Sequence, residues 1–270
     1  MSDNIGPSAQ PSKQHACHHG IYLLFEAGTR PDRDRMRPFV ASHPQHGISF
    51  DPAGSASDVA DGAKPREAAP AWLELLSSGL TFELSGLAPG ESLDMPTASQ
   101  LFDIKDANGP MEWEAVCLAP GAHLSGGERT LPVIRVMMAL ARDLVSHFEA
   151  LAAVAWMPAS AMIGRRYFES TVSAWLGGGP FPSPGLAAFE AGGGGSLRSV
   201  GLAHFIGQEI VIDPLLASDR LAATRLGARI VNQLVLTGKL SEREDIIAPD
   251  GTRLVMTPEA GGAEVHIRPG

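Results

Sequence analysis

The stretch MEWEAVCLAPGAHLSGGERTLPVIRVMMALARDLVSHFEALAAVAWMPASAMIGRRYFESTVSAWL, residues 111–176, decides the fold. Apolar and acidic residues alternate from Met111 to Cys117, which predicts a half-buried strand that ends at Pro120-Gly121. Thr130 is a candidate N-cap for the helix that follows, and Pro132 suits its first turn. Apolar residues then recur at helical spacing, at Ile134, Met137, Met138, Ala141, Leu144, Val145 and Phe148.

The second half of this stretch continues the same pattern. AAVAW, residues 152–156, is a continuous apolar run typical of an interior strand. A strand-helix-strand unit of this kind, joined in parallel, crosses over right-handed. Ser160 is then expected to cap a helix that runs to Leu176 and stops at the Gly177 run.

Shorter elements are predicted on the N-terminal side. IYLLFE, residues 21–26, predicts a buried strand, and residues 32–42 predict a short helix broken near Pro38. A short helix is expected over residues 71–77. LTFELSGL, residues 80–87, alternates as a half-buried strand does.

On the C-terminal side, strands are predicted near residues 186–190, 197–206 and 208–213, with the glycines at 192–195 as a hairpin joint. A helix is expected over residues 219–237, followed by a hairpin of LVMT and AEVHI. The sum is an α+β fold, a mixed β-sheet with helices packed on it and βαβ elements of the ferredoxin-like kind.

Composition suggests how the chain is divided. Residues 1–19 are polar and predict a disordered tail. Residues 20–70 are expected to form a small N-terminal strand-helix unit with a Gly-, Ala- and Pro-rich linker. Residues 71–270 are then the main α+β domain.

Charge and cysteine count indicate the compartment and the kind of partner. The formal net charge of -9 disfavours nucleic acid and anionic lipid as partners. The two cysteines are too few for a disulfide framework, so we expect free thiols in a reducing cytoplasm. No secretory signal is visible near the N-terminus. The uncharged run at 170–189 contains glycines and prolines that rule out a membrane span.

The order of elements resembles a bacterial family known as domain of unknown function 4261. The residues that carry the resemblance are Trp113 to Leu118, Ala122-His123, the helix from 131, the AVAW strand and GLAHFIGQEIVI at 201–212. It covers roughly residues 79–268, and the run Ile206-Gly207-Gln208-Glu209 departs from the family's more compact Phe-Gly-x-Glu. The resemblance implies a fold and no catalytic residues.

Two weak catalytic candidates stand out. Cys117 and His123 flank a Pro-Gly turn and could form an activated thiolate, although Cys117 shares the inward parity of Trp113 and an inert buried thiol is the alternative. Glu112 and Glu114 lie about 7 Å apart on one strand face, a spacing compatible with an inverting glycosidase pair or with two exposed carboxylates.

Other polar groups favour structural interpretations. The tail residues His15, Cys17, His18 and His19 predict adventitious metal affinity and no built metal site. Glu209 and Asp213 are expected to be solvated. His204 and His266 are expected to be hydrogen-bonded core or edge residues of strands and not ligands. The helix stripe of Arg225, Arg229 and Gln233 could receive an anion or simply face solvent.

No residue set in the sequence predicts a cofactor. We therefore expect a cytoplasmic bacterial protein without catalysis that binds another protein, in an immunity-like or regulatory role. The alternatives are a hydrolase of unfamiliar type, using His123 with Cys117 or a strand carboxylate, and a small-ligand sensor with a pocket lined by Trp113, Trp156 or Trp175. The sequence sets no oligomeric state.

Overall fold

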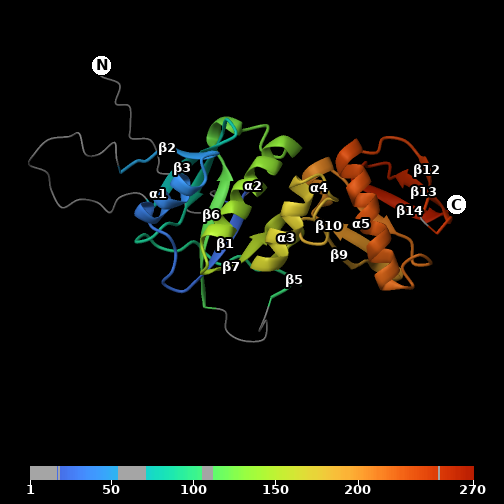
Figure 1. Ribbon diagram of the computed structural model, residues 1–270. Helices are drawn as coiled ribbons and strands as arrows, with labels where there is room; N and C mark the ends of the chain where they lie inside the picture. Colours follow the sequence, from blue (N-terminus) through green and yellow to red (C-terminus); the bar gives the residue numbers. More distant parts are fainter. Residues whose placement is uncertain (1–16, 18, 54–70, 105–111, 249) are drawn as a thin grey trace, which may run out of the picture.

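The computed structural model describes residues 17, 19–53, 71–104, 112–248 and 250–270. Helices and strands combine there into an α+β architecture, which confirms the predicted fold class. Two mixed sheets follow one another along the chain and lie side by side in space (Figure 1). The described helices are α1 Arg33–Ser42, α2 Leu131–His147, α3 Arg165–Leu176, α4 Leu202–Ile206 and α5 Arg220–Thr237, with 3₁₀ turns η1 Ala122–Leu124, η2 Met157–Ala159 and η3 Gly193–Gly195.

The first sheet has the strand order β2-β3-β4-β6-β1-β7-β8-β5 within the described residues. Its strands are β1 Ile21–Glu26, β2 His46–Phe50, β3 Trp72–Ser77, β4 Leu80–Ser85, β5 Gln100–Phe102, β6 Trp113–Pro120, β7 Leu151–Trp156 and β8 Ala161–Gly164. All neighbours in it run antiparallel except β5 and β8.

The second sheet has the order β12-β13-β14-β11-β10-β9. Its strands are β9 Ala188–Ala191, β10 Leu197–Val200, β11 Glu209–Ile212, β12 Glu244–Ile247, β13 Arg253–Pro258 and β14 Glu264–Pro269. The hairpins β9-β10 and β13-β14 confirm the predicted glycine joint and the closing hairpin. β11 and β14 pair in parallel, and α5, β12 and β13 lie between them along the chain.

Strand β1 lies at the centre of the first sheet. Leu23 pairs with Val116 of β6 on one side and with Val154 of β7 on the other, antiparallel to both. β6 and β7 are therefore parallel to each other and connected by α2, so the predicted strand-helix-strand unit is present with β1 inserted between its strands. The N-terminal strand-helix unit is thus built into the sheet of the residues that follow it, while the described chain divides into two sheets between α3 and β9.

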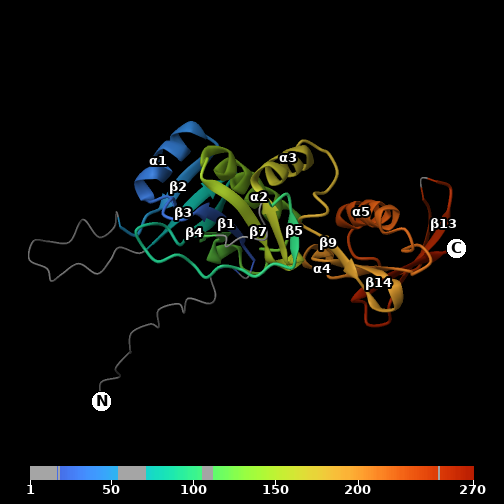
Figure 2. The same ribbon diagram turned by 90° about the horizontal axis from the view of Figure 1, so that it is seen from below.

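The helices cover one face of each sheet. Figure 2 shows α1, α2 and α3 over the first sheet and α5 over the second. The apolar stripe of α2 is buried, as its spacing predicted, with Ile134, Met138 and Ala141 fully enclosed. On the opposite face of the first sheet, Leu24, Ala115 and Met162 form a smaller cluster covered by Leu93 and Ile104 from the segment before β6.

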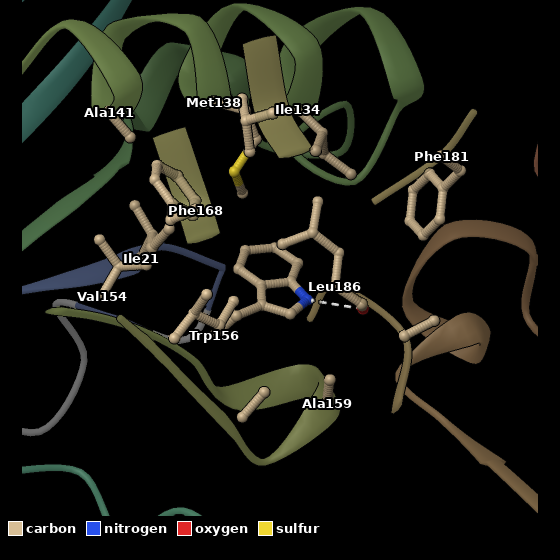
Figure 3. Close-up of a cluster of buried hydrophobic side chains, with 14 of the residues drawn as sticks. Ile21, Ile134, Met138, Ala141, Val154, Trp156, Ala159, Phe168, Phe181 and Leu186 are labelled. Atoms are coloured by element: carbon tan, nitrogen blue, oxygen red, sulfur yellow. Dashed lines mark hydrogen bonds between the residues drawn. The ribbon is translucent and has the colours of Figure 1, made fainter. Parts of the chain in front are cut away.

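Trp156, at the end of β7, joins the two halves of the core. Figure 3 shows its indole ring below Met138 of α2, with Phe168 of α3 on one side. The ring nitrogen donates a hydrogen bond of 3.1 Å to the carbonyl of Leu186, in the segment that leads to the second sheet. Because Trp156 is completely buried, its ring N–H has no access to water, and the bond to Leu186 satisfies a donor that would otherwise be unpaired.

The expected helix over 71–77 is wrong, because these residues form strand β3. Leu73 and Leu75 are buried on one face of it, with period two. Ser78 and Gly79 then form a two-residue turn with φ of 49° and 80°, and β4 begins at once. The Ser-Gly pair was the missed signal, since positive φ at both positions is typical of a tight hairpin.

Three further expectations are corrected. Ser160 adopts φ 48° at the C-terminal end of η2 and does not cap α3; residues 161–164 form the buried strand β8, and α3 begins at Arg165. Residues 202–206 form α4 and do not prolong β10, because Gly201 and Gly207 at φ 98° and 75° turn the chain at both ends. The Pro38 break does not occur, since α1 continues to Ser42. The predicted linker over 54–70 lies outside the described residues.

Gly227 in α5 allows the helix to approach the second sheet. A Cβ atom added there would lie 2.5 Å from Cε1 of Phe189 and 3.2 Å from Cδ1 of Ile212. Gly227→Ala should therefore lower the free energy of unfolding by about 1–3 kcal/mol, through overpacking. Helix propensity alone would raise it by about 1 kcal/mol.

Urea unfolding of this variant separates the two effects by sign. Ala222→Gly, at an exposed position of the same helix, serves as control and should cost about 1 kcal/mol by propensity alone. A Gly227→Ala protein more stable than the parent would show that α5 does not pack closely on Phe189.

Candidate functional site

The cysteine-histidine pair does not form a reactive site. Cys117 is fully buried in β6 and bonded to Cys17, with 6.1 Å between their Cα atoms. His123 lies in η1, where its ring contacts Oγ1 of Thr81 at 3.1 Å. The two side chains therefore have different partners, and the sulfur that was to act as nucleophile is already bonded.

The disulfide also overturns the expectation of free thiols. Strand register explains the pairing: Tyr22 lies opposite Cys117, so the residues just before β1 run beside the same part of β6. The amide of Gly20 donates to the carbonyl of Cys17 at 3.3 Å and turns the chain back toward that strand. Sequence alone could not find this contact, because 100 residues separate the cysteines.

The two candidate carboxylates of β6 are not a catalytic pair. Glu112 is exposed and precedes the strand. Glu114 lies 3.1 Å from Nε of Arg30 and accepts a hydrogen bond of 2.9 Å from the amide of Gly28. The hydrogen bond from Arg30, aided by that amide, lowers the pKa of Glu114 despite partial burial. Neither residue lines a cavity described here.

A serine-histidine-aspartate chain does occur, between β2, β3 and α2. Nδ1 of His46 lies 3.0 Å from Oγ of Ser77, and its Nε2 lies 2.9 Å from Oδ2 of Asp143. All three residues are at least nine-tenths buried, with Ser77 at 2% exposure. No cavity found among the described residues reaches Ser77. A substrate cannot reach this hydroxyl, so the chain of contacts stabilises the fold and does no nucleophilic chemistry.

Asp143 is the anchor of this network. Burial raises its pKa, but hydrogen bonds from His46, Arg142 and Gln45 outweigh burial and lower the pKa to about 2. Arg142 approaches Oδ1 to 2.6 Å, and Gln45 lies 3.0 Å from Oδ2. No sequence pattern distinguishes a solvated carboxylate at position 143 from one that is paired with a residue 97 positions away.

The cavity that gathers polar groups lies where the two sheets meet, and it has a volume of about 510 Å³. The first half of the molecule contributes Cys17, His19, Tyr22, Arg129, Met157 and Pro158 to its wall. The second half contributes Gly201, Ala203, His204 and Glu209. Gly201 lets η2 and α4 approach, since a Cβ there would lie 2.8 Å from Cβ of Ala159.

His204 is the most perturbed group in this cavity. Its ring stands edge-on to Trp156, with 4.9 Å between the centroids, and only 9% of the residue is exposed. Its Nε2 is buried and has no hydrogen-bond partner among the described residues. Burial first, and then the charges of Arg129 and His19, lower the pKa of His204 to about 4. The ring is therefore neutral at pH 7, with one nitrogen left to bind.

Glu209 is buried, so the expectation that it is solvated is wrong. One carboxylate oxygen accepts hydrogen bonds from the amides of Gly201 and Ala203 at 2.9 and 3.0 Å, and the other accepts one from Ser199. The carboxylate holds the start of α4, and with it His204, against the second sheet. Its acceptor capacity is largely used within the protein.

Arg129, His19 and Glu128 form the charged rim. Arg129 donates to the carbonyls of Ala203 and His204 at 2.9 and 3.1 Å and so bridges the two halves of the molecule. Nε2 of His19 lies 3.6 Å from Glu128, and its ring centroid is 6.1 Å from that of His204. Nδ1 of His19 and Oε2 of Glu128 are buried without a hydrogen-bond partner in the described structure.

The remaining predicted groups lie elsewhere. Trp175 packs in the core below Arg135, and Trp113 lines a separate cavity of about 360 Å³ with Arg165 and Asp103, so the tryptophans share no pocket. Arg225 and Arg229 are exposed on α5, and His266 is half-buried on β14. Of the tail residues, His15 and His18 fall outside the described part, whereas Cys17 and His19 line the first cavity.

No protein-family model, curated protein or solved structure matches this chain. Over the described ranges, no three His, Cys, Asp or Glu side chains converge in a way that could hold a metal ion. The helices of the same ranges are all too short or too polar to cross a bilayer.

Asp143→Asn should destabilise the protein by about 3–5 kcal/mol at pH 7, because His46 and Arg142 lose a buried charged partner. The pKa of Asp143 falls from 3.8 to about 2 on folding, so its contribution to stability is present above 3.8 and is lost as pH falls through 2. Urea unfolding across this range measures both effects. Asp34→Asn, at an exposed pair on α1, should change stability by less than about 1 kcal/mol; equal losses in both variants would contradict the assigned role.

His204 should make stability fall between pH 6.5 and 4. Its pKa is lowered from 6.5 to about 4, so in that window the unfolded chain binds a proton that the folded chain does not. Stability is complete above 6.5 and declines as pH falls. His204→Gln should flatten this slope in urea unfolding. His147→Gln should leave most of it, because burial also lowers the pKa of His147 but that ring is more exposed than the ring of His204; an unchanged slope in His204→Gln would contradict the assignment.

Proposed function

We propose that this protein binds a small molecule through an anionic phosphate or carboxylate group in the cavity between its two sheets, without catalysis. The observation that carries this proposal is the unpartnered, buried Nε2 of His204 in a wall that also contains Arg129. A buried polar atom without a partner is costly in a folded protein, and a ligand that satisfies it recovers that cost.

The hydrogen-bond donors around the cavity suit an anion. Arg129 is always protonated and has five N–H donors, of which the carbonyls of Ala203 and His204 use two. The nearest carboxylate in the wall, Glu209, is occupied by amides and Ser199. An anionic oxygen can therefore accept from Arg129 and from His204 in its Nε2–H tautomer.

Binding of an anion should also change the protonation of His204. Burial and the charges of Arg129 and His19 lower the pKa of His204, and a bound anion opposes the effect of these two side chains. The complex then takes up protons more readily than the free protein. Affinity should accordingly rise as pH falls from 8 toward 5, which makes the site responsive to pH as well as to ligand.

Hydrolysis is a less favourable interpretation of the same residues. Cys117 is bonded, Ser77 is sealed, and Glu114 is paired with Arg30. The cavity wall contains a neutral imidazole but no serine or free thiol for it to activate among the described residues. Ligand binding needs only hydrogen-bond donors such as Arg129 and His204, which the wall contains.

Three expectations from the sequence remain part of this proposal. The first is a cytoplasmic location, in which a cysteine pair would be reversibly oxidised. The second is a relation to the family known as domain of unknown function 4261. The third is a protein partner, which the net charge of -9 would favour if that partner is basic.

Calorimetric titration with sulfate tests the site, since the charge of sulfate does not change between pH 5 and 8. Arg129→Gln and His204→Gln should each weaken binding by about tenfold, or 1.4 kcal/mol. Arg225→Gln, an exposed arginine on α5, is the matched control and should bind like the parent. The parent should bind more tightly at pH 5.5 than at pH 8, and His204→Gln should lose that difference.

Arg129 also supports α4, so thermal unfolding should accompany each titration to show that the variants are folded. An equal loss of sulfate affinity in Arg225→Gln would place the anion site on α5. If the folded parent binds neither sulfate nor acetate, there is no anion site in this cavity.

A further inference from the structure

The disulfide is part of the cavity wall. Cys17 lines the cavity, whereas Cys117 lies in a central strand with none of its surface exposed. The bond closes a loop of 100 residues, and on its N-terminal side it holds a short segment that ends where β1 begins at Ile21. Opening it would therefore free Cys17 from β6 but leave the sheet itself intact.

The segment from Cys17 to Gly20 rests on few interactions within the described structure. The amide of Gly20 bonds to the carbonyl of Cys17, and His19 lies 3.6 Å from Glu128. Gly20 is pressed against β6, since an added Cβ would be 2.6 Å from the carbonyl oxygen of Leu118 and 3.0 Å from Sγ of Cys117. A partly exposed ion pair contributes little, so the disulfide is the strongest of these restraints within the described residues.

We infer that the Cys17–Cys117 bond is a reactive disulfide, opened from the cavity by a small anionic thiol, and that its opening dismantles the ligand site. The second half rests on the proposed anion-binding function. The first half stands on geometry: Cys17 lines a cavity that also contains Arg129, whereas Cys117 has no exposed surface.

The direction of attack follows from burial. A thiolate attacks a disulfide sulfur and forms a mixed disulfide, and the sulfur it can reach is that of Cys17. The incoming thiol gives up its proton to solvent before it enters the cavity, and it attacks as the thiolate. The S–S bond breaks, Cys117 leaves with the electron pair, and it then takes up a proton from water.

A second thiol molecule completes the reduction. It attacks the sulfur of the bound thiol, releases Cys17 as a thiol and leaves as the small-molecule disulfide. Two thiols are oxidised and one protein disulfide is reduced, so electrons balance without another reagent. Arg129 favours an anionic thiol, because its fixed positive charge in the cavity wall stabilises the attacking thiolate.

Opening the bond should remove His19 from the site. His19 supplies one of the cations that act on His204, and its ring lies beside that of His204. Without it the anion loses a partner and the cavity loses one wall. We expect sulfate affinity to fall by about tenfold in the reduced protein.

Reduction kinetics test the reaction. The full-length oxidised protein is treated with mercaptoacetate, 2-mercaptoethanol or cysteamine, which carry negative, no and positive charge, at equal thiolate concentration. Intact mass with alkylation follows the bond. Mercaptoacetate should react about tenfold faster than cysteamine at low salt, and Arg129→Gln should reduce this ratio while Arg225→Gln should not. The trapped mixed disulfide should map to Cys17. No charge preference, or an adduct on Cys117, would overturn the inference.

Hydrogen exchange and sulfate titration test the consequence. Reduced parent and Cys17→Ser should exchange faster at residues 19–22 and 202–206 than the oxidised parent, and should bind sulfate more weakly. Dithiothreitol should change nothing further in Cys17→Ser. Faster exchange on reduction, in a protein whose oxidised form does not bind sulfate, would sustain the disulfide switch and refute the binding function. Equal exchange and equal sulfate affinity in both redox states would refute the switch and leave the binding function standing.

Discussion

The structure depends on the enclosure of Trp156 at the junction of the two sheets. Its ring is covered by α2 and α3 of the first half, and its nitrogen bonds to Leu186 on the way to the second (Figure 3). Truncating a buried aromatic residue of this size typically costs about 3–5 kcal/mol. The same ring packs edge-on against His204, so the contact that joins the halves also positions the most perturbed group of the cavity.

Access to solvent decides what the polar groups can do. Ser77, His46 and Asp143 have the chemistry of a nucleophile, base and orienting acid, yet they are enclosed between two strands and a helix. Their hydrogen bonds satisfy one another, which is what a buried network requires. His204 is buried to a similar degree but borders a cavity, and one of its nitrogens has no partner in the described structure. The first set therefore stabilises the fold, while the second is available to a ligand.

The cavity is assembled from parts distant in the sequence. Its wall combines the segment before β1, the loop before α2, the turn η2 and the short helix α4. Arg129 crosses from one half to the other by bonding to carbonyls of α4, and the disulfide fastens the N-terminal segment to β6. A site composed in this way depends on each of its supports, which is why both proposals, anion binding and opening of the disulfide, concern this cavity.

The sequence by itself determined the elements with a strong period. The stripe of α2, the apolar run of β7, the helix over 219–237 and the closing hairpin are all local patterns, and the structure contains each of them. Each pattern reports how a residue relates to neighbours a few positions away, so it needs no knowledge of the fold. The α+β class followed from their order.

Tertiary structure alone decided the position of β1 between β6 and β7, the division into two sheets, and the site. Cys17 meets Cys117 only because strand register brings them together, and Glu209 is buried only because α4 turns back over its carboxylate. His204 has a lowered pKa because Trp156 and Arg129 surround it. These are contacts between residues far apart in the chain, and hydrophobic periodicity carries no information about which distant partners will meet.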